Sequence, residues 1–300
     1  MMKLDEKFLR GSYPPLVTPF KDGEVDYNCY ARLVEHQIEN GTHGILVTGT
    51  TGEPSTLTID ERAKLVEVAV QTSNGRVPVV AATGTESYVG TAELTNKAEK
   101  AGADALLIVT PYYIKPPQRG LVEYYAALGK ESKLPMMIYH IPGRTAVSVP
   151  VSTVAEIAAR VPTLVGIKHA VVDLDYVTEV LDHMGMDFRI FVGLESLSFP
   201  MLCVGACGLM NAVGNLAPKR VSQMCEEVFA GNLAAARKLH FDLFGLNKAV
   251  FLDTNPIPMK YMMMKMGLLE RAEHRLPMVT VTDTQAKELD ALLKEAGLVG

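Results

Sequence analysis

Short, continuously apolar segments recur along the whole chain, and longer segments of mixed polarity separate them. Eight apolar segments, rich in Val, Ile and Leu, mostly lack alternation with polar residues, which is typical of parallel strands covered on both faces. They follow one another at roughly 20 to 35 residues, the length of a strand, a helix and two loops. The predicted strands are residues 14–20, 44–50, 77–84, 105–111, 136–142, 164–170, 188–194 and 208–215.

The separating segments carry helix signals. One begins at Asp26, ends at Gly41 and places apolar residues at near-helical spacing in between. Another opens with Thr58 and has Glu61 three residues later, a capping-box pattern. Eight strands, each followed by a helix, predict an α/β fold of the (β/α)8 TIM barrel type. An open doubly wound sheet is the competing arrangement, but no Gly-x-Gly-x-x-Gly follows the first predicted strand.

Strand signals stop after about Ala217, and the remaining segments all read as helices. We therefore expect a catalytic barrel over residues 8–225 and a C-terminal helical region over residues 226–300. The Met-rich run 259–266 suggests either a soft binding surface or core packing, and its helical spacing favours the core.

Composition and charge exclude several classes of protein. The 300 residues are 48% hydrophobic, and 29 basic against 34 acidic residues give a net charge of -5, which offers no footprint for nucleic acid or anionic lipid. No apolar stretch is long enough to span a bilayer, and the four cysteines contain no Cys-x-x-Cys, so we expect a cytoplasmic protein without disulfides. The histidines are scattered and no metal-binding motif occurs, so no catalytic metal is expected.

In a barrel of this type, the active site lies at the carboxyl ends of the strands. Lys168 lies inside the apolar segment LVGIKHA, where its amine would be withdrawn from water. Burial disfavours the charged ammonium and leaves neutral amine able to attack a carbonyl, which is Schiff-base chemistry. The alternative is a structural ion pair inside the barrel, with Glu53 or Asp173 as its partner.

Further candidates follow other strands. Thr50 and Thr51 lie in GTTGE, where backbone N–H groups can face a carboxylate, although the motif also suits a simple strand-to-helix turn. Tyr113 and Tyr139 can relay protons, although either could be ordinary packing. Arg144 presents a fork suited to a second carboxylate, although a solvated loop arginine is its alternative.

The segments GTTGEPSTL, TPYYIKPPQRGL, YHIPGRTAV, GIKHA and NPIPMKYMM together resemble the dihydrodipicolinate synthase and N-acetylneuraminate lyase family. The resemblance runs from about Gly11 to the last helix. It implies a pyruvate-dependent class I lyase in which Lys168 forms the imine with pyruvate. It also implies that no cofactor or metal takes part and that the chain forms a homo-oligomer, a tetramer built from tight dimers.

The resemblance also assigns roles to the other candidates. Thr50, Tyr113 and Tyr139 match the family's proton relay, with Tyr113 reaching into the site of a neighbouring subunit. Thr51 matches the residue that holds the carboxylate of pyruvate. Two further candidate substrate-binding residues are Gly193, near the end of the seventh predicted strand, and Met210, within the eighth.

The second substrate is less specified. Arg144 stands where the synthases of the family receive the carboxylate of aspartate semialdehyde, which favours that substrate. His140, Ile114 and His169 depart from the common synthase pattern. A 2-oxo-acid aldolase that releases pyruvate from a 4-hydroxy-2-oxo acid is therefore the main alternative, and a non-catalytic pyruvate-binding relative is a minor one.

Overall fold

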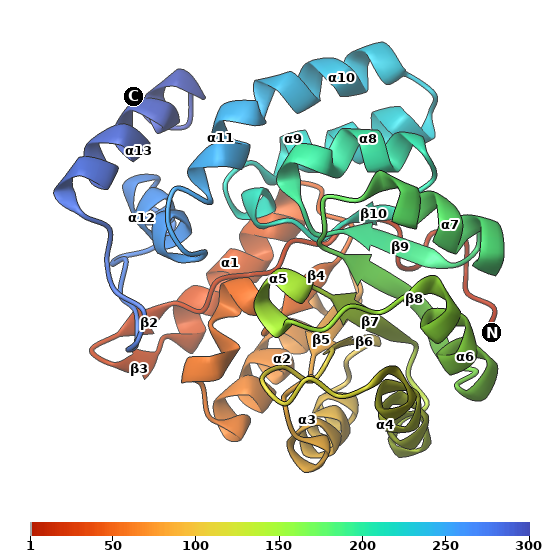
Figure 1. Ribbon diagram of the computed structural model, residues 1–300. Coiled ribbons are helices and arrows are strands. Elements are labelled where there is room, and N and C mark those ends of the chain that lie inside the picture. The colour runs from red at the N-terminus through yellow and green to blue at the C-terminus, as the bar shows by residue number, and fades with distance from the viewer. Residues whose placement is uncertain (1) are drawn as a thin grey trace.

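The computed structural model describes residues 2–300 and contains a parallel eight-stranded barrel surrounded by helices (Figure 1). The strands are hydrogen-bonded in the order β1-β10-β9-β8-β7-β6-β5-β4. Between the two ends of this order, Leu46 N–H donates to Pro14 O and Leu16 N–H donates to Leu46 O, so the barrel is closed. The barrel strands are β1 (Gly11–Ser12), β4 (Ile45–Val47), β5 (Val79–Ala82), β6 (Ala105–Val109), β7 (Met136–His140), β8 (Leu164–His169), β9 (Arg189–Val192) and β10 (Gly208–Leu209).

The helices around the barrel follow the predicted capping signals. Asp26 caps the first helix by accepting from Cys29 N–H, and Thr58 and Glu61 form a complete capping box on the second. The helices are α1 (Tyr27–Glu39), α2 (Ile59–Ser73), α3 (Tyr88–Lys100), α4 (Gln118–Glu131), α5 (Pro142–Thr145), α6 (Val151–Arg160), α7 (Leu174–Met184) and α8 (Ser198–Cys203). Single 3-10 turns lie at η1 (Thr50–Gly52), η2 (Pro54–Thr56), η3 (Glu195–Leu197) and η4 (Ala212–Asn215).

The first predicted strand is displaced. Residues 14–20 were expected to form it, but the barrel strand is Gly11–Ser12, and the later segment contributes only a bridge between Pro15 and Leu46. Pro14, Pro15 and Pro19 have no N–H to give to a ladder, which explains why regular pairing does not extend through this segment. The segment ends instead in a small antiparallel hairpin, β2 (Phe20–Lys21) with β3 (Glu24–Val25).

Alternation along the strands produces two apolar layers. One fills the barrel interior and includes Leu107, Met137 and Phe191, and the other lies between the strands and the surrounding helices. The register between β7 and β8 shifts at Met136 and Met137, and Lys168 is then paired with Tyr139. The catalytic candidates on these two strands are therefore fixed by a packed scaffold.

The C-terminal helices cover one side of the barrel (Figure 1). Met259, Met262 and Met263 are buried, which confirms the core interpretation of the Met-rich run. The predicted boundary between residues 225 and 226 falls inside α9 and stays a prediction. These helices are α9 (Pro218–Phe229), α10 (Leu233–Asp242), α11 (Phe244–Ala249), α12 (Ile257–Lys265) and α13 (Asp283–Glu295).

Three general expectations concern cysteines, membranes and metals. All four cysteines are free. Within residues 2–300, no helix combines the length and the apolar character needed to cross a membrane. Across the same residues, no three His, Cys, Asp or Glu side chains are grouped so that they could hold a metal ion.

Candidate active site

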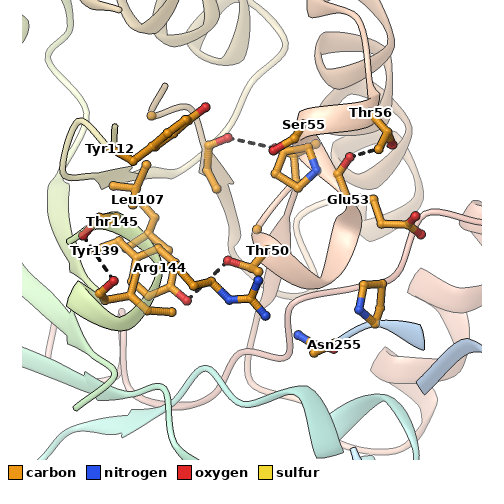
Figure 2. Close-up of a pocket in the computed structure, with 18 of the residues that line it drawn as sticks. Thr50, Glu53, Ser55, Thr56, Leu107, Tyr112, Tyr139, Arg144, Thr145 and Asn255 are labelled. Atoms are coloured by element: carbon orange, nitrogen blue, oxygen red, sulfur yellow. Dashed lines mark hydrogen bonds between the residues drawn. The ribbon is translucent and has the colours of Figure 1, made fainter. Parts of the chain in front are cut away.

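The loops at the carboxyl ends of the barrel strands enclose a cavity of about 350 Å³. Thr50, Tyr139 and Arg144 line it, and Asn255 from the C-terminal region closes one side (Figure 2). A smaller recess of about 60 Å³ shares these four residues and reaches Lys168. The predicted residues other than Tyr113 are thus brought together by loops that are distant in sequence, as the barrel geometry requires.

Lys168 lies on β8 directly opposite Tyr139 on β7. Its side chain is almost fully buried, and Nζ lies 4.4 Å from the centre of the Tyr139 ring. At Gly193, a Cβ atom would come within 2.8 Å of Lys168 Cε, so glycine is needed there for the lysine to occupy this position. Gly193 and Met210 both line the recess beside Lys168.

The structural ion-pair alternative for Lys168 is wrong. Among residues 2–300, no carboxylate forms an ion pair with it. Glu53 is paired with Lys260 and His274, and Asp173 caps α7 by accepting from Tyr176 N–H.

Thr50 and Thr51 begin the 3-10 turn after β4. Thr50 Oγ1 lies 3.4 Å from the Tyr139 hydroxyl, within hydrogen-bond distance (Figure 2). Thr51 is buried, and Asn255 Nδ2 donates to its Oγ1 at 2.9 Å. Because the Thr51 oxygen accepts from Asn255, its own hydroxyl hydrogen is free to donate to another group, as a carboxylate-binding residue must.

A buried charged cluster fixes the turn that carries the two threonines. Glu53, two residues after Thr51, forms an ion pair with Lys260 of α12, and His274 Nδ1 lies 3.2 Å from its other oxygen. Burial lowers the pKa of Lys260 to about 8, and the Glu53 carboxylate opposes that shift. The C-terminal region thereby fixes the turn that carries Thr50 and Thr51 through the ion pairs of Glu53.

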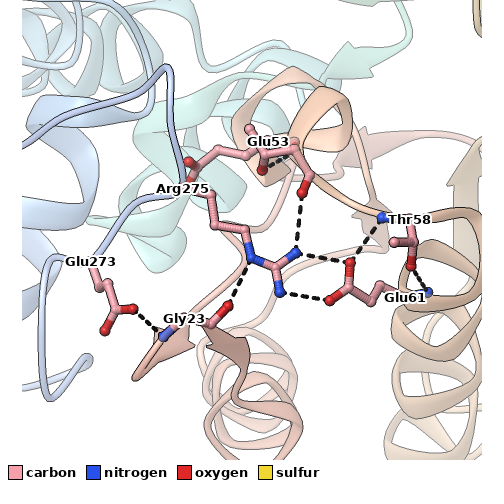
Figure 3. A network of polar contacts seen from close by, with 7 residues as sticks. Gly23, Glu53, Thr58, Glu61, Glu273 and Arg275 are labelled. Atoms are coloured by element: carbon pink, nitrogen blue, oxygen red, sulfur yellow. Dashed lines mark hydrogen bonds and ion pairs between the residues drawn. The ribbon is translucent and has the colours of Figure 1, made fainter.

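Arg275 makes a second connection from the C-terminal region to the same loop. Its guanidinium donates to both carboxylate oxygens of Glu61, at 2.7 and 2.9 Å, and to the carbonyl oxygens of Gly23 and Thr56 (Figure 3). Glu61 is also the residue that closes the capping box of α2. The helix after β4, the β2–β3 hairpin and the C-terminal region are therefore tied together at one side chain.

Arg144 lies on the short helix α5, immediately after β7. Figure 2 shows its side chain extending past Tyr139 toward Thr50, and it lines both the cavity and the recess. Tyr113 behaves differently. It is 89% exposed, has a left-handed backbone with φ of 69°, and does not line the cavity, whereas its neighbour Tyr112 does.

Three residues of the site were not predicted. Glu195 follows β9 and lines the recess with Lys168; its carboxylate accepts from Ala212 N–H at 2.6 Å. Burial raises the pKa of Glu195 to about 7, against the hydrogen bond from Ala212 and the charge of Lys168. The position of Glu195 just after a predicted strand was the sequence signal that could have identified it.

Lys260, like Lys168, is a lysine within an apolar run, which is the same sequence signal. Asn255 lies in the NPIP segment and was given no role.

The comparison with protein families agrees with this geometry. The model of the dihydrodipicolinate synthetase family matches residues 8–296. The chain belongs to this family.

Members of the family with assigned names are similar over nearly the whole chain. The 4-hydroxy-tetrahydrodipicolinate synthase of Thermus thermophilus is 43% identical over 291 residues, which cover 97% of both chains. The synthase of the same name from Thermotoga maritima is 42% identical over 293 residues, 97% of this chain and 99% of its own.

Solved structures of the family confirm the fold. The dihydrodipicolinate synthase of Thermotoga maritima superposes with a TM-score of 0.94 at 41% identity, covering 98% of this chain and all of that one. The Aquifex aeolicus enzyme gives 0.94 at 38% identity, over 96% of this chain and 98% of its own. The (β/α)8 barrel with C-terminal helices is therefore shared with the family.

Proposed function

We propose that this chain is a 4-hydroxy-tetrahydrodipicolinate synthase, which condenses pyruvate with L-aspartate 4-semialdehyde. The observation that carries the proposal is the position of Lys168. Its amine is buried, has no carboxylate partner within residues 2–300, and lies in a recess shared with Tyr139 and Thr51. The names of the family members that match 97% of the chain support the same reaction.

The first step is imine formation. The neutral amine of Lys168 attacks the C2 carbonyl of pyruvate, one proton passes from nitrogen to the departing oxygen, a second comes from the Tyr139 hydroxyl, and water leaves a protonated imine. The protonated imine then withdraws electrons from C3, which loses a proton and becomes a nucleophilic enamine carbon. That carbon forms a bond to the aldehyde carbon of the second substrate, whose oxygen takes up a proton. Because the protonated imine is the electron sink, the proposed reaction needs no metal or cofactor.

Each remaining residue has a role in this scheme. The Thr51 hydroxyl, with its oxygen occupied by Asn255, donates to the carboxylate of pyruvate. Tyr139 and Thr50, 3.4 Å apart, exchange protons with the carbonyl oxygen and C3. Arg144 binds the carboxylate of the semialdehyde at the open side of the recess.

Tyr113 extends away from its own cavity, so we propose that it completes the proton relay in a neighbouring subunit. A left-handed backbone in a residue with a large side chain is costly, and such conformations occur most often at functional sites. The proposed assembly is a homotetramer built from dimers. One structural relative is a monomeric dihydrodipicolinate synthase variant, with a TM-score of 0.94 at 41% identity over 98% of each chain, and sedimentation of the purified protein distinguishes the two states. The cytoplasmic location expected from the sequence also stays a prediction.

The direct test is an assay of purified protein with pyruvate and L-aspartate 4-semialdehyde. We expect consumption of both substrates in equal amounts, also after exhaustive chelation of metals. A matched assay offers 4-hydroxy-2-oxo acids and follows the release of pyruvate. Release of pyruvate, with no consumption of the semialdehyde, would replace the synthase by the aldolase alternative.

A further inference from the structure

His140 and His169 lie behind the catalytic candidates, on the outer face of the barrel. They are the last residues of β7 and β8 and are paired in register, one position after the pair Tyr139 and Lys168. Both histidines are almost fully buried. Their rings pack against Tyr176 of α7, the His169 ring stacking on it at 4.6 Å with an angle of 9° between the planes.

The hydrogen bonds of the two rings form a chain with only one possible direction. Val149 N–H lies 3.3 Å from His140 Nε2, and a backbone N–H can only donate, so Nε2 carries no proton. At the other end, His169 Nε2 lies 3.2 Å from the carbonyl oxygen of Asp173, which can only accept, so this Nε2 carries the proton. The two Nδ1 atoms are 3.3 Å apart, and neutral His140 then donates from Nδ1 to the bare Nδ1 of His169.

This series of hydrogen bonds holds the segment that carries Arg144. The segment leaves β7 at His140, forms α5 and returns at Val149, whose N–H is bound by the ring of His140 itself. The carbonyl oxygen of Val149 accepts from the Tyr176 hydroxyl at 2.7 Å. The His140 ring therefore closes the loop on which Arg144 is mounted, and His169 orients that ring.

We propose that His140 and His169 are positioning residues for Arg144, and that they act as a pair of neutral histidines with opposite tautomers. The inference rests on the proposed function in one respect, the binding of the second substrate's carboxylate by Arg144. The chain of hydrogen bonds does not depend on that assignment.

The hydrogen bonds between the two rings and their partners leave no ring nitrogen that could take up an additional proton. A proton on His140 Nε2 would face Val149 N–H, and a proton on His169 Nδ1 would face the His140 N–H, so either protonation breaks one link. Burial lowers the pKa of both histidines, that of His140 to about 4, and the His169 ring also disfavours charge on His140. The Asp173 carboxylate favours the protonated forms, but burial outweighs it.

The other ionisable groups nearby are a phenol and a second carboxylate. The Tyr176 phenol packs on both rings, and Glu179 on the same helix acts on Tyr176. Lys168 and Tyr139 line the recess on the inner face of the barrel. We therefore expect His140 to stay neutral down to a pH well below 6, and the pKa of His169 to lie below its ordinary value.

The tautomers are tested on the unmutated protein by nitrogen NMR with labelled histidine. We expect one buried histidine to carry its proton on Nδ1 and the other on Nε2 at pH 8, with no titration of His140 between pH 8 and pH 5.5. Assignment uses the spectra of His140→Asn and His169→Asn. Two identical tautomers, or titration of either ring near pH 6.5, would contradict the proposed hydrogen bonds between two neutral histidines.

The positioning role is tested with His169→Phe, which keeps a ring to stack on Tyr176 but removes both nitrogens. We expect KM for the semialdehyde to rise about tenfold, while kcat and KM for pyruvate change less than twofold. His169→Asn, which keeps an acceptor near the Nδ1 position, should recover most of this loss. His183→Phe, at the exposed C-terminal end of α7, is the matched control and should leave all constants unchanged.

Comparison with Arg144→Ala separates the two ways of failing. If Arg144→Ala raises KM for the semialdehyde and folded His169→Phe does not, the positioning role is wrong and the proposed function stands. If Arg144→Ala has no such effect, the assignment of Arg144 in the proposed function fails, whereas the NMR result still decides whether the histidine chain exists.

Discussion

The Nζ atom of Lys168 lies 4.4 Å from the centre of the Tyr139 ring, and the two residues are paired in register on neighbouring parallel strands. The Tyr139 ring is thus the aromatic partner of this amine; no carboxylate among residues 2–300 forms an ion pair with it, and the Glu195 carboxylate feels its charge from farther away. Lys260, the other buried lysine, has a carboxylate partner in Glu53. Among residues 2–300, Lys168 is thus a buried lysine without an ion-pair partner, whereas Lys260 forms a buried ion pair.

This contrast predicts which lysine reacts. Borohydride reduction in the presence of pyruvate should attach a three-carbon unit to Lys168 and leave Lys260 unmodified, because only Lys168 lines a recess open to substrate. Peptide mass spectrometry locates the label. A label at Lys260 or at a surface lysine, or no label at all, would contradict the proposed imine.

Tyr139→Phe removes the hydroxyl that lies 3.4 Å from Thr50 and keeps the ring beneath Lys168. We expect kcat to fall about 10²-fold, the usual effect of losing a general acid–base group. Tyr125→Phe is the control: this buried tyrosine donates to Ile108 O away from the cavity, and its loss should cost about 1 kcal/mol of stability without lowering kcat. Equal kcat values for the two variants would remove Tyr139 from the relay.

Tyr113 predicts complementation between inactive subunits. Tyr113→Phe and Lys168→Ala should each be nearly inactive, but subunits dissociated, mixed and reassembled should regain activity, because a mixed dimer contains one site with both groups. With equal amounts and random pairing across a two-fold interface, about a quarter of the sites are restored. Absence of recovery in mixtures shown by native mass spectrometry to contain mixed dimers would confine Tyr113 to its own subunit.

Much of this site was predictable because it follows from strand order. Lys168, Thr50 and Arg144 were all selected as residues at or just after predicted strands, and the closed barrel brings exactly such positions to one end. Asn255 was not assigned a role, because its contact with Thr51 spans 204 residues and depends on how the C-terminal helices dock. No periodicity encodes such a contact.

The displaced first strand has a different cause. Residues 14–20 have the apolar composition of a barrel strand, but composition reports burial rather than hydrogen bonding. The prolines in this segment remove the donors that a ladder requires, so the chain packs in the core while pairing only at Pro15 and Leu46. Glu53 is the wrong partner for Lys168 for a similar reason. The sequence places Glu53 near the site but does not indicate that it forms an ion pair with Lys260 instead.

Arg144→Ala should separate the two substrates. Loss of a charge-assisted contact costs about 1.5 to 3 kcal/mol, which corresponds to a rise of about tenfold to hundredfold in KM for the semialdehyde. KM for pyruvate should change little, because Thr51 rather than Arg144 is assigned to its carboxylate. Arg144→Lys keeps the charge but loses the two-pronged guanidinium, so its KM for the semialdehyde should lie between those of the unmutated protein and Arg144→Ala. Equal effects on both substrates would favour an acceptor without a carboxylate at this position.

The buried histidines predict how stability depends on pH. In the unfolded chain His140 has a pKa near 6.5, and in the folded chain burial lowers it to about 4. Between these values the unfolded state binds more protons than the folded state. The contribution of His140 therefore lowers the free energy of unfolding as the pH drops below about 6.5, and this decrease ends near pH 4. At pH 5, the contribution of His140 alone is about 2 kcal/mol. Urea unfolding at pH 7.5 and pH 5 should therefore show a smaller acid-induced loss in His140→Asn than in the unmutated protein. His183→Asn, an exposed histidine replaced in the same way, should retain the full loss. If His140→Asn loses as much stability on acidification as the unmutated chain, the ring is already protonated in the folded state at pH 5.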